Sequence, residues 1–275
     1  MVDKALIDLT HRFSKMVGRI ADVPVPTVVR DPLWSVVGRA LGVDVRSTRD
    51  GLDTFETFGS FFGRALKENA RPVADEALAV VPCDGLCVAA GRLASDEQTV
   101  RVKGHTYTVG ALLGMNPAEV SRGTLYYWVI YLAPRDYHRV HAPVSGSLHS
   151  VRHVPGTLFP VNALGVRFVP ALFTRNERVV FSGAQHDGSP WALSMVGALG
   201  VGSIAVNAKV AKNLCVSGQD GARSAVVNHE IRKGSEIGAF KLGSTVILGL
   251  VSDAQLSSKV RVGSVCRMGE PLFDN

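Results

Sequence analysis

The 275-residue sequence contains no apolar run that approaches the roughly 18 residues of a membrane-spanning helix. Its N-terminus also lacks the uninterrupted apolar stretch of a signal peptide, because Asp8, His11, Arg12 and Lys15 interrupt it. We therefore expect an intracellular protein that does not cross a membrane.

Cysteine is scarce in this chain. There are 4 cysteines, and no two of them have the CxxC spacing that is typical of a zinc or redox site. We expect them to be small buried hydrophobic side chains in a reducing compartment. They are Cys83, Cys87, Cys215 and Cys266.

Charged residues make up only 20% of the chain and hydrophobic residues 46%, as in an ordinary folded protein. The formal net charge of +6 favours an anionic partner. The basic residues are spread along the chain, without the Lys/Arg blocks or base-stacking motifs of a nucleic-acid-binding protein. We therefore predict no nucleic-acid partner and favour a membrane surface or a phosphorylated substrate.

The segment from Asp3 to Asp22 has the pattern of an amphipathic helix. This pattern fits a helix in a membrane interface, where basic side chains reach anionic headgroups. It fits equally a helix that packs on the core of its own protein, and the sequence leaves both interpretations open. The apolar face carries Leu6, Leu9, Phe13, Met16, Val17 and Ile20. The other face is mostly basic and carries Lys4, Asp8, Arg12, Lys15 and Arg19.

Two further helices are expected before residue 75. Asp31-Pro32 has the cap and first-turn proline of a helix start, and it precedes an apolar pattern that includes Trp34. A third helix is expected in TFETFGSFFGRALK, whose aromatic stripe fits either core contacts or contacts with acyl chains. The stripe consists of Phe55, Phe58, Phe61, Phe62 and Leu66.

After Arg71-Pro72 the chain consists of short apolar runs separated by glycine and proline, such as ALAVVP, LYYWVIYLAP and STVILGLV. This punctuation indicates many strands joined by tight turns. We therefore predict an α+β protein with two parts. Residues 1–75 form a helical, membrane-associating region, and residues 76–275 form a compact, mainly antiparallel β-rich catalytic domain.

Three polar spots interrupt the apolar runs with groups that are costly to bury unless they are paired or functional. Asp84 lies in VPCDG, His138 and His141 lie in YLAPRDYHRVHAP, and Gly243-Ser244 lies in FKLGSTVIL. Each spot has a plain interpretation: Asp-Gly is common in turns, paired histidines are often solvated, and Gly-Ser between two strands is typical of a hairpin. An aspartate, a histidine and a serine are also the parts of a nucleophile with an oriented base.

Several long motifs follow one another between about Thr54 and about Leu250. They read FFGRALKENARPV, VPCDG, VKGHTYTVGALLG, YLAPRDYHRVHAP, LFPVNALGVRFVPALFTRNERVV, VGALGVGSI and KGSEIGAFKLGSTV. In this order they resemble the phosphatidylserine decarboxylase family, whereas residues 1–50 are similar only in being helical and amphipathic. Cys83 stands where another small residue is common in the family.

The resemblance implies a proenzyme that cuts itself between Gly243 and Ser244 and converts Ser244 into a covalent pyruvoyl group at the start of a short C-terminal chain. By motif, Asp84 would be the orienting acid, His141 the base and Ser244 the nucleophile, while His138 would assist decarboxylation. Phosphatidylserine would form a Schiff base with the pyruvoyl group and release CO2 to give phosphatidylethanolamine. The family also implies a homodimer of two-chain protomers, peripheral on the cytoplasmic side of the cell membrane.

The chemistry of these residues suits self-cleavage. His141 takes the hydroxyl proton of Ser244, and the oxygen attacks the carbonyl of Gly243, which a glycine leaves open to approach. The resulting ester loses its acyl chain by β-elimination, and the dehydroalanine hydrolyses to pyruvoyl and ammonia. Loss of CO2 then leaves a carbanion delocalised into the pyruvoyl amide. Either His138 or His141 returns the proton, and the sequence does not rank them.

Other functions compete with this one. A serine hydrolase would use Asp84, His141 and Ser244 on an external substrate, although its serine would lack a GxSxG elbow. A pyruvoyl decarboxylase of a soluble amino acid leaves the amphipathic N-terminal helix without a purpose, and a β-rich binding module would carry the polar spots only as turns. No HExxH pattern or further ligand supports a metal at the two histidines, so we predict none. Candidates for holding the substrate phosphate are Lys103, Arg135 and Arg175.

Overall fold

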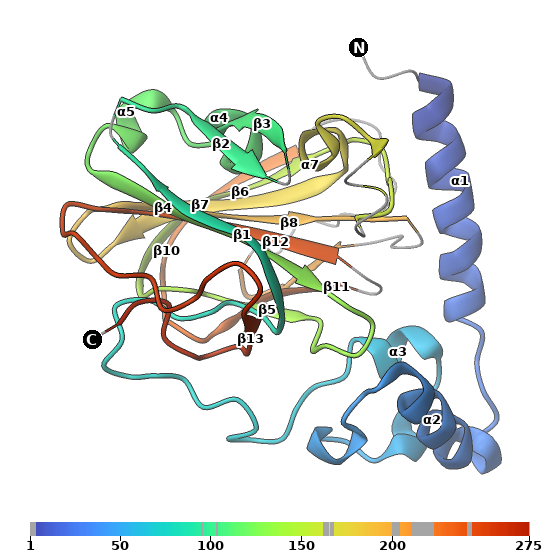
Figure 1. Cartoon of the computed structure of the whole chain (residues 1–275). Helices are drawn as coiled ribbons and strands as arrows, with labels where there is room; N and C mark the ends of the chain where they lie inside the picture. The colour runs from blue at the N-terminus through green and yellow to red at the C-terminus, as the bar shows by residue number, and fades with distance from the viewer. Residues whose placement is uncertain are drawn as a thin grey trace.

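The computed structural model describes residues 4–94, 96–102, 104–161, 165, 168–199, 204–210, 223–240 and 244–274. Helices near the N-terminus precede a mainly antiparallel β-structure, which confirms the predicted α+β class (Figure 1). The helices are α1 (Lys4–Ala21), α2 (Thr27–Leu41), η1 (Val45–Ser47), η2 (Leu52–Thr54), α3 (Phe58–Phe62), α4 (Val109–Leu113), α5 (Pro117–Val120) and α7 (Leu172–Arg175). The strands are β1 (Gly85–Leu93), β2 (Thr99–Val102), β3 (His105–Thr108), β4 (Thr124–Leu132), β5 (Arg139–His141), β6 (Gly146–Val154), β7 (Arg178–Gln185), β8 (Pro190–Val196), β9 (Ile204–Val206), β10 (Arg223–Ile231), β11 (Glu236–Phe240), β12 (Ser244–Ser252) and β13 (Val265–Cys266).

The strands of the described residues form a main sheet of 8 strands, a small sheet of 3 strands and a two-stranded ribbon. The main sheet has the order β10-β6-β7-β8-β12-β4-β1-β13, the small sheet has the order β5-β11-β9, and β2 pairs with β3. Strands β4 and β12 are neighbours near the middle of the main sheet. They are almost continuously apolar because side chains on both of their faces are buried.

Different elements cover the two faces of the main sheet. On one face, Gly249 of β12 lies against Leu113 of α4, whose Cδ1 would be 2.5 Å from a Cβ added to the glycine. On the other face, Gly238 of β11 approaches Met195 of β8, whose Sδ would be 3.1 Å from such a Cβ. Met195 pairs with Val246, three residues from Gly249 along β12, so the two contacts lie on opposite faces. The main sheet is therefore sandwiched between α4 and the small sheet (Figure 1).

Helix α2 begins earlier than the sequence predicts. Its first residue is Thr27 and Pro32 lies inside it, so the predicted start at Asp31-Pro32 is wrong. An internal proline removes one helical hydrogen bond, and tertiary packing offsets this loss. Trp34 is buried and donates its indole N–H to the carbonyl oxygen of Phe55 at 2.8 Å.

The aromatic stripe of the predicted third helix lies mostly in a core. Phe55 and Phe61 are buried together with Trp34 and Val43 in a small cluster of their own, separate from the core of the β-structure. Helix α3 itself covers only five residues of the predicted segment. The stripe therefore holds the N-terminal helices together, as core contacts do.

Helix α1 turns small and polar side chains towards the β-structure. Thr10 and Ser14 are buried, and Thr10 Oγ1 accepts the N–H of Leu158 at 3.3 Å. His11 Nε2 lies 2.7 Å from the carbonyl oxygen of Gly156. The apolar stripe of this helix is therefore turned away from the protein's own core. Its exposed members are Leu9, Phe13, Met16 and Ile20, while the side chain of Leu6 lies outside the described ones.

Among the described helices, none combines the length and the apolarity that crossing a bilayer requires. The thiols of Cys83, Cys87 and Cys266 are buried and free, as expected, and Cys215 lies outside the described residues. Burial raises the pKa of Cys87 to about 11 and that of Cys266 to about 12. These thiols therefore stay protonated and act as apolar side chains.

The structure contradicts the plain interpretation of Gly243-Ser244 as a hairpin. Strand β11 ends at Phe240 in the small sheet, and β12 begins at Ser244 in the main sheet. The connection therefore passes from one sheet to the other. Gly243, the residue before the predicted cleavage bond, lies outside the described residues.

Candidate active site

Ser244 is the first residue of β12, and it is fully buried. It pairs with Leu132 at the end of β4. Its side chain lies on the same face as Val246 and therefore faces the small sheet, which covers the neighbouring Met195. Among the described residues its Oγ has no hydrogen-bond partner. An unpaired buried hydroxyl costs free energy, so it needs an explanation such as a role in chemistry.

His138 lies in the turn between β4 and β5 and is fully buried. Its Nδ1–H donates to the carbonyl oxygen of Asp136 at 2.9 Å, so the lone pair is on Nε2. No described residue is a partner of this Nε2. The ring packs on Phe62, with 4.0 Å between ring centroids. Burial lowers the pKa of His138 from 6.5 to about 3, so the imidazole is neutral near pH 7.

The turn that bears His138 also holds both ends of the connection between β11 and β12. The N–H of Phe240 donates to the carbonyl oxygen of His138 at 2.9 Å. Four residues later, Ser244 pairs with Leu132, where the same turn begins. The structure thus brings His138 and Ser244 to the same end of β4.

His141 lies in β5, and both of its ring nitrogens have partners. Its Nδ1–H donates to the carbonyl oxygen of Gly234 at 2.8 Å. Its Nε2 accepts the hydroxyl of Tyr137 at 3.1 Å. Burial lowers the pKa of His141 and raises that of Tyr137, so the ring is neutral and the phenol keeps its proton. In the intact chain His141 is oriented by a main-chain carbonyl and a phenol.

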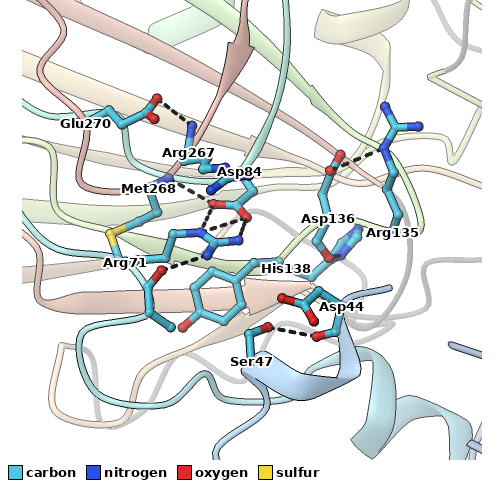
Figure 2. Close-up of polar contacts among 12 residues, drawn as sticks. Asp44, Ser47, Arg71, Asp84, Arg135, Asp136, His138, Arg267, Met268 and Glu270 are labelled. Atoms are coloured by element: carbon cyan, nitrogen blue, oxygen red, sulfur yellow. Dashed lines mark hydrogen bonds and ion pairs between the residues drawn. The ribbon is translucent and has the colours of Figure 1, made fainter. Parts of the chain in front are cut away.

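Asp84 is buried just before β1, and its carboxylate is held by two other segments (Figure 2). The guanidinium of Arg71 donates through Nε, at 2.9 Å and 3.0 Å from the two oxygens, and through Nη2. The main-chain N–H of Met268 donates to Oδ1 at 2.9 Å. The Nδ1–H of His141 that the sequence hypothesis assigns to Asp84 is donated to Gly234 instead. A forked guanidinium binds a carboxylate more strongly than a neutral imidazole does, which accounts for the difference.

The sequence does not assign the side chains that surround these residues to the site. Arg71, Tyr137 and Phe62 all lie inside the quoted motifs, but the sequence does not indicate which candidate residue each one contacts. The phosphate candidates are dispersed: Arg135 is exposed and lies 3.8 Å from Asp136, Arg175 lies over the ring of Phe159, and Lys103 is outside the described residues.

Comparisons with known proteins show the family of this chain. The family model described as phosphatidylserine decarboxylase matches residues 58–274. A phosphatidylserine decarboxylase proenzyme of Pseudomonas aeruginosa is 39% identical over 273 residues, which cover 95% of this chain and 92% of that relative. Proteins of the same name from Anaeromyxobacter sp. and Shewanella sediminis are 36% and 35% identical, and each match covers 95% of this chain and 93% of the relative. The chain therefore belongs to the phosphatidylserine decarboxylase family.

Proposed function

We propose that this chain is a phosphatidylserine decarboxylase proenzyme that cleaves itself between Gly243 and Ser244. The observation that carries the proposal is the environment of Ser244, a buried hydroxyl without a described partner beside the turn that bears His138. A fully buried serine does not meet an external ester or peptide. The carbonyl nearest in the chain is that of its own neighbour, Gly243. This supports self-cleavage over a serine hydrolase.

Self-cleavage uses groups of the chain itself. His141, the base that the family motif suggests, takes the Ser244 proton, and Oγ displaces the Ser244 nitrogen from the Gly243 carbonyl to give an ester and a free amine. Elimination then breaks the Cβ–O bond and releases the long chain as a carboxylate. Water converts the resulting dehydroalanine to a keto group and ammonia. Tyr137 has to leave His141 Nε2 first, because this atom has a single lone pair.

The place of Ser244 suits a pyruvoyl group. After the cut, β12 can keep its pairs with β4 and β8, so the new chain end stays at the same place. The unpartnered His138 Nε2 provides a buried polar atom that a transferred proton can use. The pyruvoyl carbonyl would supply the electron sink for the pair released with CO2. His138 is the better candidate to carry the proton to the substrate carbon, because its free Nε2 can first take the proton that the substrate ammonium group loses on forming the Schiff base, whereas Nε2 of His141 is engaged.

A lipid substrate is supported by residues 1–75, which we propose as the membrane-associating region. Its exposed basic side chains are suited to anionic headgroups, and its exposed apolar side chains to the acyl boundary. We propose peripheral binding on the cytoplasmic side of the cell membrane. A decarboxylase of a soluble amino acid would have no use for this surface. The basic side chains are Arg12, Lys15 and Arg19, and the apolar ones are Leu9, Phe13, Met16, Ile20, Val28, Leu33 and Val36.

A homodimer of two-chain protomers remains part of the proposal, because the family resemblance implies it. Light scattering of the processed protein in detergent tests this directly. A mass of two protomers is expected, and a mass of one would contradict it.

The experiment that tests the function measures CO2 release from phosphatidylserine micelles, phosphoserine and serine by the purified protein. Release from the lipid alone is expected, and equal release from serine would contradict the lipid substrate. Two variants separate the histidines. His141→Ala should stay uncut, whereas His138→Ala should be cut but release little CO2. An uncut His138→Ala together with a processed His141→Ala would reverse the proposed roles.

A further inference from the structure

Arg64 is a buried cation two residues after the end of α3, with 3% of its surface exposed. Its guanidinium donates to main-chain carbonyls only: to Phe62 at 3.4 Å, and to Arg135 and Asp136 at 3.2 Å each. None of the ion pairs of the described residues includes Arg64. Burying a charge without a direct ion pair is costly, and burial lowers the pKa of Arg64, so this residue needs a reason beyond stability.

That reason lies in the carbonyl of Asp136, which serves two donors. It accepts Nη2 of Arg64 at 3.2 Å and Nδ1–H of His138 at 2.9 Å. The acceptor that selects the His138 tautomer is therefore itself held by Arg64. Phe62, two residues before Arg64, packs on the ring from the same short segment. Residues 62–64 thus fix both the plane of the imidazole and the direction of its Nδ1–H.

The charge of Arg64 also favours the neutral form of the His138 imidazole. Burial is the largest cause of the lowered pKa of His138, and the positive charge of Arg64 lowers this pKa further. The hydrogen bond to the Asp136 carbonyl acts in the opposite direction and raises the pKa of His138. A neutral imidazole with its proton on Nδ1 leaves the Nε2 lone pair open. This form can take the proton that the substrate ammonium group loses on forming the Schiff base, and then pass it to the reacting carbon.

We propose that Arg64 is a positioning residue for His138: it holds the Asp136 carbonyl and thereby fixes the His138 tautomer whose Nε2 serves decarboxylation. This inference rests on the proposed function. Arg64 does not touch the reacting atoms, and it acts through the turn at residues 135–138.

Arg178 provides a matched control. It is also a buried arginine that binds only main-chain carbonyls, those of Thr174, Asn176 and Ala111, and burial lowers its pKa to about 10. It contacts α4, on the face of the main sheet away from Ser244. Arg178→Met should therefore lower stability as Arg64→Met does, without an effect on His138.

The test compares Arg64→Met, Arg64→Lys and Arg178→Met with the wild type by kcat and KM on phosphatidylserine micelles, thermal unfolding, and 15N NMR of the histidine rings. The His138 signals are assigned by their absence in His138→Asn. Arg64→Met should lower kcat on the order of 10²-fold with little change in KM, as a misplaced catalytic group does. Its His138 spectrum should show a mixture of tautomers, and Arg64→Lys should recover part of both effects. Arg178→Met should keep kcat within about twofold of the wild type.

Equal losses of kcat in Arg64→Met and Arg178→Met, or an unchanged His138 tautomer in Arg64→Met, would overturn the inference. If Arg64→Met does not fold, the same comparison is made with Arg64→Lys, where a wild-type kcat and tautomer would overturn it. The wild-type assay separates the two proposals. A wild type that releases no CO2 refutes the proposed function, while the NMR comparison still decides whether Arg64 sets the His138 tautomer.

Discussion

The outward apolar face of α1 leads to a quantitative prediction about vesicle binding. Phe13 is 44% exposed and Ile20 is 66% exposed, so together they offer about one side chain of apolar surface to a bilayer. Immersing one such side chain contributes roughly 2 kcal/mol. Replacing both with asparagine should therefore weaken partitioning onto anionic vesicles by about 30-fold. Folding stability should change little, because neither side chain belongs to the core.

The assay is co-sedimentation with vesicles, with all variants in a Ser244→Ala background so that the chain stays in one piece. The control is Leu78→Asn with Val262→Asn, which removes similar exposed surface, 50% and 63%, from loops of the β-structure. Phe13→Asn with Ile20→Asn should lose binding, and the control should keep it. Equal binding of both double variants, or a larger loss in the control, would refute membrane docking through α1.

Three further results are expected. Gly234→Ala should slow self-cleavage, because the Gly234 carbonyl accepts the Nδ1–H of His141, and it should destabilise the fold by about 1 kcal/mol in urea unfolding, because φ of Gly234 is 80°. An unchanged cleavage rate would contradict this prediction. Arg71→Met should cost about 3 kcal/mol in the same assay, since it leaves Asp84 buried without its cation, and a loss below about 1 kcal/mol would mean the pair is dispensable. His138 binds its second proton more weakly in the folded state, with a pKa of about 3 against 6.5. Its contribution to the free energy of unfolding is therefore complete above about pH 6.5 and is lost as the pH falls towards 3. Relative to His138→Asn, the wild type should lose ~2 kcal/mol between pH 7 and pH 5, and parallel pH curves would contradict the burial of this imidazole.

The β-rich body and the helical N-terminal region could be predicted from the sequence, because strands buried on both faces, such as β4, read as unbroken apolar runs. The pairing of the strands could not be predicted from the sequence. Gly243-Ser244 between two apolar runs has the local signature of a hairpin, yet β11 and β12 belong to different sheets. Partner choice depends on residues far away in sequence, such as Leu132 opposite Ser244, and no local pattern encodes it.

The same limit applies to helices. The period of α1 predicts a helix, but which face docks is set by contacts such as that of His11 with Gly156, 145 residues away. The sequence does not predict the start of α2, because the packing of Trp34 offsets the cost of a proline inside the helix. Tertiary contacts override local helix signals where they contribute the larger free energy.

For the site, the types of the chemical groups were predictable and their partners were not. The structure brings Ser244 and His138 to one turn, as two parts of a single site require. It also gives Asp84 to Arg71, and it gives His141 to Gly234 and Tyr137. An Asp, His and Ser pattern names candidates, whereas the geometry of a folded chain decides which hydrogen bonds form.

The most direct test of the account is the intact mass of the wild type and of Ser244→Ala, with borohydride reduction of any C-terminal fragment. We expect the wild type to split before residue 244 into a long chain and a short chain with a blocked, reducible N-terminus, while Ser244→Ala stays whole. A wild type that remains at full length after native expression would contradict self-cleavage and the pyruvoyl mechanism with it.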